Sequence, residues 1–264
     1  MRFCPIASGS SGNCVYVGTD KTHLLVDAGL SGKRIENALS RLGISCAEKL
    51  TGILVTHEHS DHASGVGIMS RRYNIPVYAT PNTWRYFLRH GTIGKVTEEL
   101  RRIIVPNESL VIGDMEVLPF DIPHDASQPV GYCLEGNRYK AAVATDMGYV
   151  TDTVRALLKD ADVLLVESNH DVEMLEKGRY PRALKDRVNG SRGHLSNVAA
   201  GALLADIASE RCRHVFLGHL SEENNRPLVA LDTVQNILAA NDVVVNRLSV
   251  ADRHEPSEMV ELGQ

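Results

Sequence analysis

The sequence predicts an α/β fold in which two mixed β-sheets pack face to face and helices cover their outer sides. Short β-branched runs separated by turn residues fill the first half of the chain, and strands alternate with helical patterns in the second half. The apolar faces of such sheets need covering layers of helices. No repeat or Pro/Gly-rich linker marks a boundary, so we expect residues 1–264 to form a single domain.

The expected elements follow one another closely. The strands of the first half are predicted at 2–6, 14–17, 23–26, 53–56, 76–79, 103–105, 116–122, 130–134 and 139–144. Ser31 should cap a helix that ends at Leu42 before Gly43, and further helices are expected at 61–73 and 82–90. The second half is predicted as helix 151–159, strand 163–166, helix 195–209, strand 215–217, helix 228–240 and strand 243–249.

Composition excludes several classes of protein. With 43% hydrophobic and 23% charged residues the chain is typical of globular proteins, and its formal net charge of -5 means that any binding of a polyanion must be local. Five scattered cysteines argue against a disulfide framework or a thiolate zinc site and favour a reducing cytoplasm. No apolar segment suits a signal peptide or a membrane span, so we expect a cytoplasmic protein without membrane contact.

One motif carries most of the chemical information. Residues 56–62 read THEHSDH and follow the predicted strand 53–56. His57 and His59 are two residues apart on extended chain and can face one metal ion, while Asp61 and His62 can face a second. Nitrogen and oxygen ligands suit Zn²⁺, Mn²⁺ or Fe²⁺. A lone histidine is usually a packed or surface residue, but this cluster indicates metal-dependent hydrolysis.

An HxHxDH motif after an apolar strand resembles the signature of the metallo-β-lactamase superfamily, whose fold is a four-layer αββα sandwich of two mixed sheets. The resemblance extends over most of the chain and implies two divalent metal ions. It also implies a role for four residues outside the motif: Asp27 would orient the metal-binding loop, His124 would bind the first ion, Asp146 would bridge both, and His219 would bind the second.

Two further residues point to a branch of that superfamily. Glu167 in LLVE and His194 in GHLSN resemble the Glu and His pair of ribonuclease Z-like phosphodiesterases, in which the histidine serves the phosphate and the leaving group. A carboxylate that holds an imidazole protonated would let it donate a proton or stabilise charge. The alternative is structural, with Glu167 ending a strand and His194 capping a helix.

A narrower resemblance rests on three segments. Residues 8–14 (SGSSGNC), 167–171 (ESNHD) and 190–197 (GSRGHLSN) resemble the bacterial WalJ/YycJ group, which implies a cytoplasmic DNA exonuclease acting from 5′ ends. The loop at 8–12 would present N–H groups to a phosphate or form a plain turn. His170 would touch metal or substrate, or lie at the surface.

The lengths of two intervals between candidate ligands, and a basic run, narrow the expected type of nuclease. The 22 residues from His124 to Asp146 are too few for the tRNA-binding arm of ribonuclease Z enzymes, and the 73 from Asp146 to His219 leave no room for the extra domain of β-CASP nucleases. Between 177 and 192 stand six basic residues against one acid, which either grip a phosphate backbone or form a solvated helix face. Other basic residues would add to this run only if they face the same way: Arg71, Arg72, Arg85 and Arg89.

We therefore expect phosphodiester hydrolysis in which a hydroxide held between two metals and aligned by Asp61 attacks phosphorus, while His194, supported by Glu167, serves the opposite side. DNA is the expected substrate. A phosphodiesterase for small nucleotides or cyclic phosphates would need the same site without the basic run. β-Lactamases, thioesterases and lactonases have little use for the Glu167 and His194 pair. A metal-stabilised interaction module is the non-enzymatic alternative.

Overall fold

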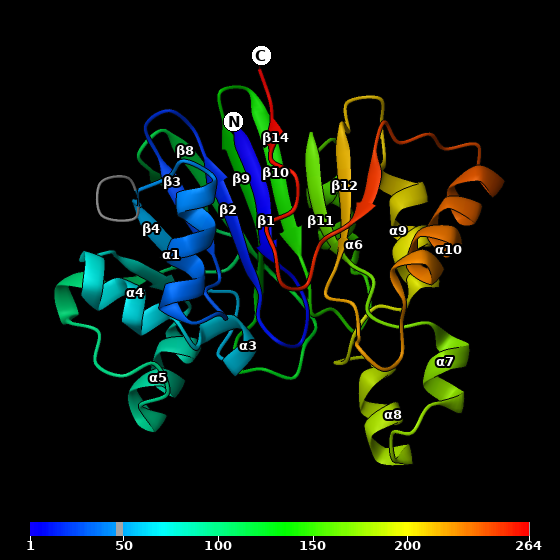
Figure 1. The fold of residues 1–264 in the computed structure, drawn as a ribbon, viewed down its shortest axis with the longest axis horizontal. Coiled ribbons are helices and arrows are strands. Elements are labelled where there is room, and N and C mark those ends of the chain that lie inside the picture. Colours follow the sequence, from blue (N-terminus) through cyan, green and yellow to red (C-terminus); the bar gives the residue numbers. More distant parts are fainter. Residues whose placement is uncertain (46–49, 264) are drawn as a thin grey trace. The chain divides into compact units, whose positions relative to one another are not determined.

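The computed structural model describes residues 1–45 and 50–263, so Cys46, one of the five cysteines, lies outside the described residues. The chain has two compact units. Unit 1 comprises Met1–Asp121, Ala126–Tyr139 and Asp252–Gln264, and unit 2 comprises Ile122–Asp125 and Lys140–Ala251. Among the described residues, the strands belong to two mixed sheets of seven strands with helices beside them (Figure 1). This confirms the predicted fold class.

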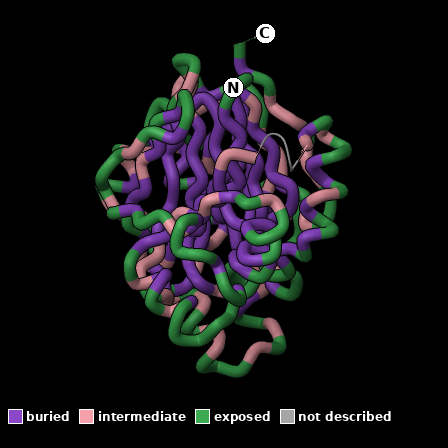
Figure 2. Tube along the Cα trace, turned by 90° about the vertical axis from the view of Figure 1, so that its left-hand side faces the viewer, coloured by how far each residue is buried: buried purple, intermediate pink, exposed green. Residues whose placement is uncertain are grey.

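The first sheet lies wholly in unit 1. Its strand order is β14-β1-β2-β3-β4-β5-β6, antiparallel from β14 to β3 and parallel from β3 to β6. The bounds are β1 Arg2–Ala7, β2 Cys14–Gly18, β3 His23–Val26, β4 Gly52–Leu54, β5 Val77–Ala79, β6 Arg101–Ile103 and β14 Val260–Glu261. β2, β3 and β4 are buried at every residue, and the strands in Figure 2 are coloured as buried over most of their length. These strands supply much of the core of unit 1.

Helices α1 (Gly32–Arg41), α4 (Val66–Tyr73) and α5 (Pro81–His90) pack on this sheet. Ser31 caps α1 as predicted, because its side chain accepts a hydrogen bond from Arg34 N. Each helix inserts apolar side chains into the core cluster, among them Leu39, Met69 and Trp84. The short 3₁₀ helix η1 (Glu98–Leu100) leads into β6.

The single helix expected at 61–73 is wrong. The structure has α3 (Ser60–Ala63) and α4 (Val66–Tyr73), separated at Gly65. Gly65 N donates to Ala28 O at 2.7 Å, and a Cβ at Gly65 would lie 2.2 Å from Leu30 O. The backbone of the loop after β3 therefore interrupts the helix, and this contact cannot be inferred from helical periodicity.

An antiparallel run of β7 (Leu110–Ile112), β8 (Met115–Asp121) and β9 (Val130–Gly136) also belongs to unit 1. β7 was not predicted, because it is only three residues long and one of them, Val111, is exposed. The strand expected at 103–105 begins two residues earlier, at Arg101.

Unit 2 is built on the parallel strands β10 (Tyr139–Ala144), β11 (Val163–Glu167), β12 (His214–Gly218) and β13 (Leu248–Val250). β11 and β12 are buried at every residue, as expected for central parallel strands. α6 (Asp152–Leu158), α9 (Asn197–Ile207) and α10 (Pro227–Ala240) match the predicted helices. Two further helices, α7 (Val172–Lys177) and α8 (Arg182–Val188), were not predicted and stand beyond the ends of β11 and β12 (Figure 1).

The cysteines agree with the expectation from sequence within the described residues. Cys4, Cys14, Cys133 and Cys212 are buried, and these four described cysteines are thiols that do not form disulfides. Burial raises the pKa of Cys4 to about 12 and that of Cys212 to about 11, so both are protonated at neutral pH. In the described part of the chain no helix is both long enough and apolar enough to cross a membrane.

Candidate functional site

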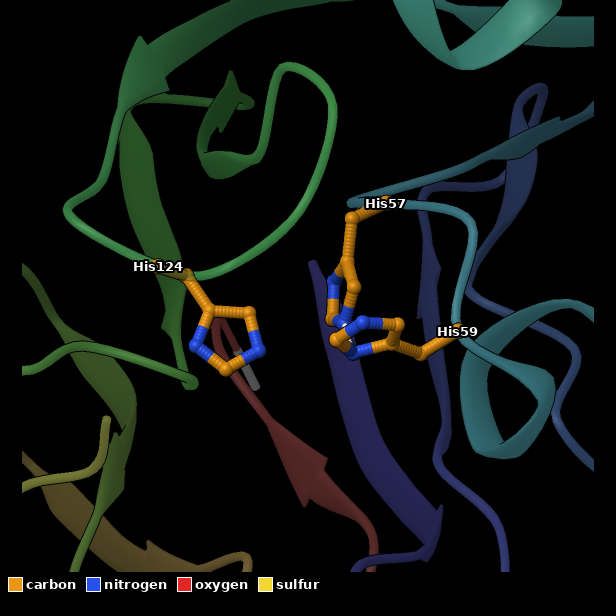
Figure 3. A group of neighbouring side chains, drawn as sticks. All are labelled: His57, His59 and His124. Atoms are coloured by element: carbon orange, nitrogen blue, oxygen red, sulfur yellow. Dashed lines mark hydrogen bonds between the residues drawn. The ribbon is translucent and has the colours of Figure 1, made fainter. Parts of the chain in front are cut away.

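In unit 1 the predicted metal-binding motif follows directly after β4. His57 and His62 are buried and His59 is partly exposed. His57 Nε2 lies 3.0 Å from His59 Nδ1, and the two rings meet edge to face at 82° (Figure 3). The spacing of two on extended chain therefore points both imidazoles to one place, as predicted. Two ring nitrogens at this distance can share a proton or donate lone pairs to one cation.

Asp27 anchors the motif through hydrogen bonds. It follows β3 with a φ of 60°, a left-handed conformation that is uncommon for residues other than glycine. Its carboxylate accepts hydrogen bonds from Thr56 N at 2.8 Å, Thr56 Oγ1 at 2.8 Å and His62 Nδ1 at 2.7 Å. Complete burial raises the pKa of Asp27, although the bonds from His62 and Thr56 oppose the rise. The strained backbone is kept because it aims both carboxylate oxygens at the motif.

This contact decides which nitrogen of His62 can bind a ligand. With Nδ1–H directed at Asp27, the lone pair belongs to Nε2. His62 Nε2 lies 3.0 Å from Asn13 Nδ2 and 3.5 Å from Asp61 Oδ2. Asn13 was not singled out from the sequence, since a polar residue at the end of a Ser/Gly loop carries no signal of its partner 49 residues away.

The loop at 8–12 is a turn that positions Asn13. Gly12 N donates to Gly9 O at 2.9 Å, Gly9 N donates to Asn13 Oδ1 at 2.8 Å, and Ser8 N donates to Asp252 O at 3.0 Å. These three N–H groups form hydrogen bonds within the protein. Of the two interpretations from sequence, the plain turn fits better than the phosphate loop.

Gly29, in the loop after β3, lies close to the backbone of the motif. A Cβ there would lie 1.7 Å from Asp61 O and 2.9 Å from Asn13 N, both backbone atoms. We expect Gly29→Ala to lower the free energy of unfolding by about 1–3 kcal/mol, because the loop must move away from Asp61. Chemical denaturation measures this. Gly32→Ala is the control, because the three atoms nearest its Cβ would be side-chain atoms, of Ile68, Met69 and Arg72, and not backbone; an equal loss in both variants would contradict the close-approach argument.

Unit 2 contains a second group of predicted residues. Asp146, Glu167, His194 and His219 each place one ligand atom within 4.8 Å of the others. They come from the ends of β10, β11 and β12 and from the loop before α9. Asp146 and His219 have φ values of 62° and 54°, so both adopt the left-handed conformation seen at Asp27. The carboxyl ends of neighbouring parallel strands meet at one edge of the sheet, and this gathers the side chains.

Glu167 is the centre of this group. Its Oε1 lies 2.8 Å from His194 Nδ1 and 2.9 Å from His219 Nδ1, while its Oε2 accepts from Met147 N at 2.8 Å and Leu195 N at 3.0 Å. The carboxyl group is fully buried. Glu167 therefore holds two imidazoles and two backbone segments.

Burial and charge act in opposite directions within this group. Burial by itself raises the pKa of Glu167, but His194 and His219 lower it overall, so the carboxylate is charged. Burial lowers the pKa of His194, yet Glu167 and Asp146 raise it above its ordinary value. An imidazole held in this way by a carboxylate is oriented through Nδ1 and presents Nε2.

His124 lies in the same unit as this group. His124 Nδ1 is 3.2 Å from Gly193 O, and His124 Nε2 is 3.4 Å from Asp125 Oδ1 and 3.8 Å from Asp146 Oδ1. Burial lowers the pKa of His124, with Asp146 opposing the change, so the ring is neutral near pH 7. A neutral imidazole is the form that binds metal.

The donor sets fit divalent cations. Three buried imidazoles share one arrangement in which an acceptor engages Nδ1: Asp27 for His62, Gly193 O for His124, and Glu167 for His219. Acceptors of this kind fix the tautomer of metal-binding histidines and direct Nε2 to the ion. Within each unit the candidate ligands are imidazoles and carboxylates, which suits Zn²⁺, Mn²⁺ or Fe²⁺.

Comparison with known proteins decides the family. The model of the β-lactamase superfamily domain matches residues 22–220. Exodeoxyribonuclease YycJ of Bacillus anthracis is 42% identical over 90% of this chain and 89% of its own length. Exodeoxyribonuclease WalJ of Streptococcus pneumoniae serotype 2 (strain D39) is 39% identical over 93% and 91%. The chain belongs to the β-lactamase superfamily, in its WalJ/YycJ group.

The fold agrees with this assignment. A Zn²⁺-bound PqqB from Methylobacterium extorquens aligns over 98% of this chain and all of its own, with a TM-score of 0.74 and 18% identity. At that identity the likeness concerns the fold alone. The superfamily and group that the motifs indicated are thus confirmed, as is the class of metal-dependent hydrolase.

The structure corrects one expectation, for His170, and adds one residue, Asn225, that the sequence did not indicate. His170 is fully buried and pairs through its backbone with Ser196, so its placement at the surface is wrong. Asn225, which carried no sequence signal, donates from Nδ2 to Ser168 O, Asn169 O and Asn197 Oδ1 at 2.9–3.0 Å. It fastens the segment after Glu167 to the start of α9.

Proposed function

We propose that this hydrolase is a cytoplasmic DNA exonuclease that works from 5′ ends and that its two units act as one domain. The observation that carries the proposal is the contact of 2.8 Å between Glu167 Oε1 and His194 Nδ1. Hydrolases of β-lactams, thioesters or lactones have little use for such a pair, whereas phosphodiester cleavage needs a group for the phosphate and the leaving oxygen. The names of the YycJ and WalJ relatives, both exodeoxyribonucleases, support DNA as the substrate.

We propose two divalent ions, Zn²⁺, Mn²⁺ or Fe²⁺, for the chain. The ligands would be His57, His59, Asp61 and His62 of unit 1 and His124, Asp146 and His219 of unit 2, as the resemblance to the superfamily implies. Such ions polarise a phosphoryl oxygen and lower the pKa of a water to near 7. Family membership and the oriented imidazoles of each unit support this assignment.

The protein's own residues complete the chemistry. Asp61, partly exposed at the start of α3, would align the attacking water. The side chain of His194 is 19% exposed and is held at Nδ1 by Glu167, so Nε2 can reach a substrate. Because Glu167 raises the pKa of His194, the ring can carry a proton to the leaving oxygen or stabilise charge on the phosphate.

The test uses metal-reconstituted protein with single- and double-stranded DNA and RNA, each labelled separately at the 5′ and the 3′ end. We expect early release of labelled mononucleotides from 5′-labelled DNA, and stepwise shortening of 3′-labelled DNA. Chelation should abolish cleavage, and added Mn²⁺ or Zn²⁺ should restore it.

Three outcomes would contradict the proposal in different ways. Mononucleotides released first from the 3′ label would reverse the polarity. Hydrolysis of bis(p-nitrophenyl) phosphate without cleavage of any polymer would favour a phosphodiesterase for small nucleotides or cyclic phosphates. No hydrolysis of any diester would remove the nuclease function altogether.

A further inference from the structure

The most basic stretch of the chain lies beside the half of the site carried by unit 2. Residues 177–192, here called the basic arm, hold six basic residues and one acid, whereas the whole chain has a formal net charge of -5. The arm includes α8 (Arg182–Val188) and the loop that leads to His194. A local positive charge on an acidic chain is the feature that binding of a polyanion requires.

The arm contributes little to the core. α8 has no buried residue, and at seven residues it is shorter than the roughly 12–15 needed for a helix to be stable by itself. Arg182 pairs with Asp186 at 2.7 Å and with Glu176 at 3.2 Å, but its side chain is 72% exposed. Exposed pairs of this kind contribute about 0–1 kcal/mol. The fold therefore gains little from the charge of Arg182, which remains accessible to a ligand. Lys185 is partly exposed and its Nζ donates to Glu176 O, a single bond that a phosphate can replace.

One arginine ties the arm to a predicted metal ligand. Arg187 Nε donates to Asp125 Oδ2 at 2.6 Å, and Asp125 follows His124 in the chain. Asp125 N donates in turn to Arg192 O at 3.1 Å. Two bonds, one from α8 and one from the loop after it, thus hold the arm against the His124 segment.

The end of the arm is built into the same group of residues. His194 N donates to Val188 O at 2.8 Å, and His124 Nδ1 contacts Gly193 O at 3.2 Å. A Cβ at Gly148, two residues after Asp146, would lie 2.3 Å from the backbone of Ser191. Any substrate phosphate at His194 is therefore next to the arm.

We propose that the basic arm binds the phosphodiester backbone of the DNA strand adjoining the scissile phosphate, with Arg182 and Lys185 as the contacts. The inference rests on the proposed nuclease function. Arg182 and Lys185 are three residues apart and share one face of α8, while Arg187 is turned to Asp125. α8 is about 10 Å long, so two basic side chains on it can reach neighbouring phosphates of one strand.

The test replaces two charges on the arm. We expect Arg182→Gln/Lys185→Gln to lower kcat/KM for single-stranded DNA at least about tenfold relative to kcat/KM for bis(p-nitrophenyl) phosphate, since only the polymer reaches the arm. The slope of log Kd for DNA against log salt concentration should fall by about 1.4, which is 0.7 for each lost phosphate contact. Circular dichroism checks that the variant is folded.

The control is Arg155→Gln/Lys159→Gln on α6 and its C-terminal end, in the same unit. It removes the same charge from a helix that is not part of the arm, and the ratio of the two activities should stay within twofold of the wild type. If the arm variant keeps the wild-type ratio and salt slope while the wild type cleaves DNA, the inference is wrong and the nuclease function stands. If the wild type cleaves only the small diester, both fail.

Discussion

Asp27→Asn is expected to weaken metal binding about 10–100-fold and to lower hydrolysis of a chromogenic diester about 100-fold. Both carboxylate oxygens of Asp27 are acceptors, for Thr56 N, Thr56 Oγ1 and His62 Nδ1. An amide offers one acceptor and one donor group, so its NH₂ must face either a Thr56 donor or the N–H of His62. Either His62 loses the bond that fixes its tautomer, or Thr56 N loses its acceptor and the loop that carries the motif must shift. Metal content per chain and a competition titration measure the first effect.

Stability should respond much less than metal affinity. Burial raises the pKa of Asp27, which means that the folded protein bears a cost for keeping this carboxylate charged. A neutral amide removes part of that cost, so we expect the free energy of unfolding to fall by less than about 2 kcal/mol. A variant that binds metal normally yet unfolds readily would show that Asp27 is only a structural residue.

Asp114→Asn is a matched control for this experiment. Asp114 lies in the same unit and also accepts hydrogen bonds from threonine hydroxyls, Thr19 Oγ1 at 2.7 Å and Thr22 Oγ1 at 2.6 Å. These bonds lower its pKa, and its side chain is exposed. Its hydrogen bonds are to Thr19 and Thr22, neither of which is a candidate ligand, so diester hydrolysis and metal content should remain at the wild-type level.

The parts of the site that the sequence predicted are those that a local pattern specifies. His57 and His59 meet because a spacing of two on extended chain directs both side chains the same way. Asp146 and His219 were implied by the resemblance to the superfamily, and the parallel pairing of β10, β11 and β12 gathers the strand ends that they follow. Periodicity and turn residues also gave most strands and helices, since buried strands and amphipathic helices have distinct spacings.

Features that depend on contacts between distant segments could not be predicted in this way. Asn13 reaches His62, and Gly65 breaks a helix where it meets Ala28, but neither residue differs locally from ordinary loop residues. β6 includes Arg101 because an edge strand with exposed side chains need not be apolar. α8 has no apolar face in the core, so hydrophobic periodicity does not reveal it.

Glu167→Gln should have the largest effect of any single change considered, with a loss of about 1,000-fold in diester hydrolysis. Glu167 Oε1 contacts His194 Nδ1 and His219 Nδ1, and His219 is a proposed metal ligand. We therefore expect Glu167→Gln to reduce metal content as well as turnover. His194→Ala should lose about 100-fold in turnover and keep its metal, because His194 is proposed to serve the phosphate.

The two variants together test whether Glu167 acts through both histidines. If it does, Glu167→Gln/His194→Ala should be hardly less active than Glu167→Gln alone, because the contact between the two side chains is already lost. Equal activity losses in the two single variants, both with full metal content, would instead mean that Glu167 acts through His194 alone. Glu210→Gln, an exposed glutamate of the same unit, should change neither quantity. The free energy of unfolding of Glu167→Gln should fall by about 1–3 kcal/mol. A buried amide cannot accept from all four donors that contact Glu167, which are the two imidazoles and the N–H groups of Met147 and Leu195.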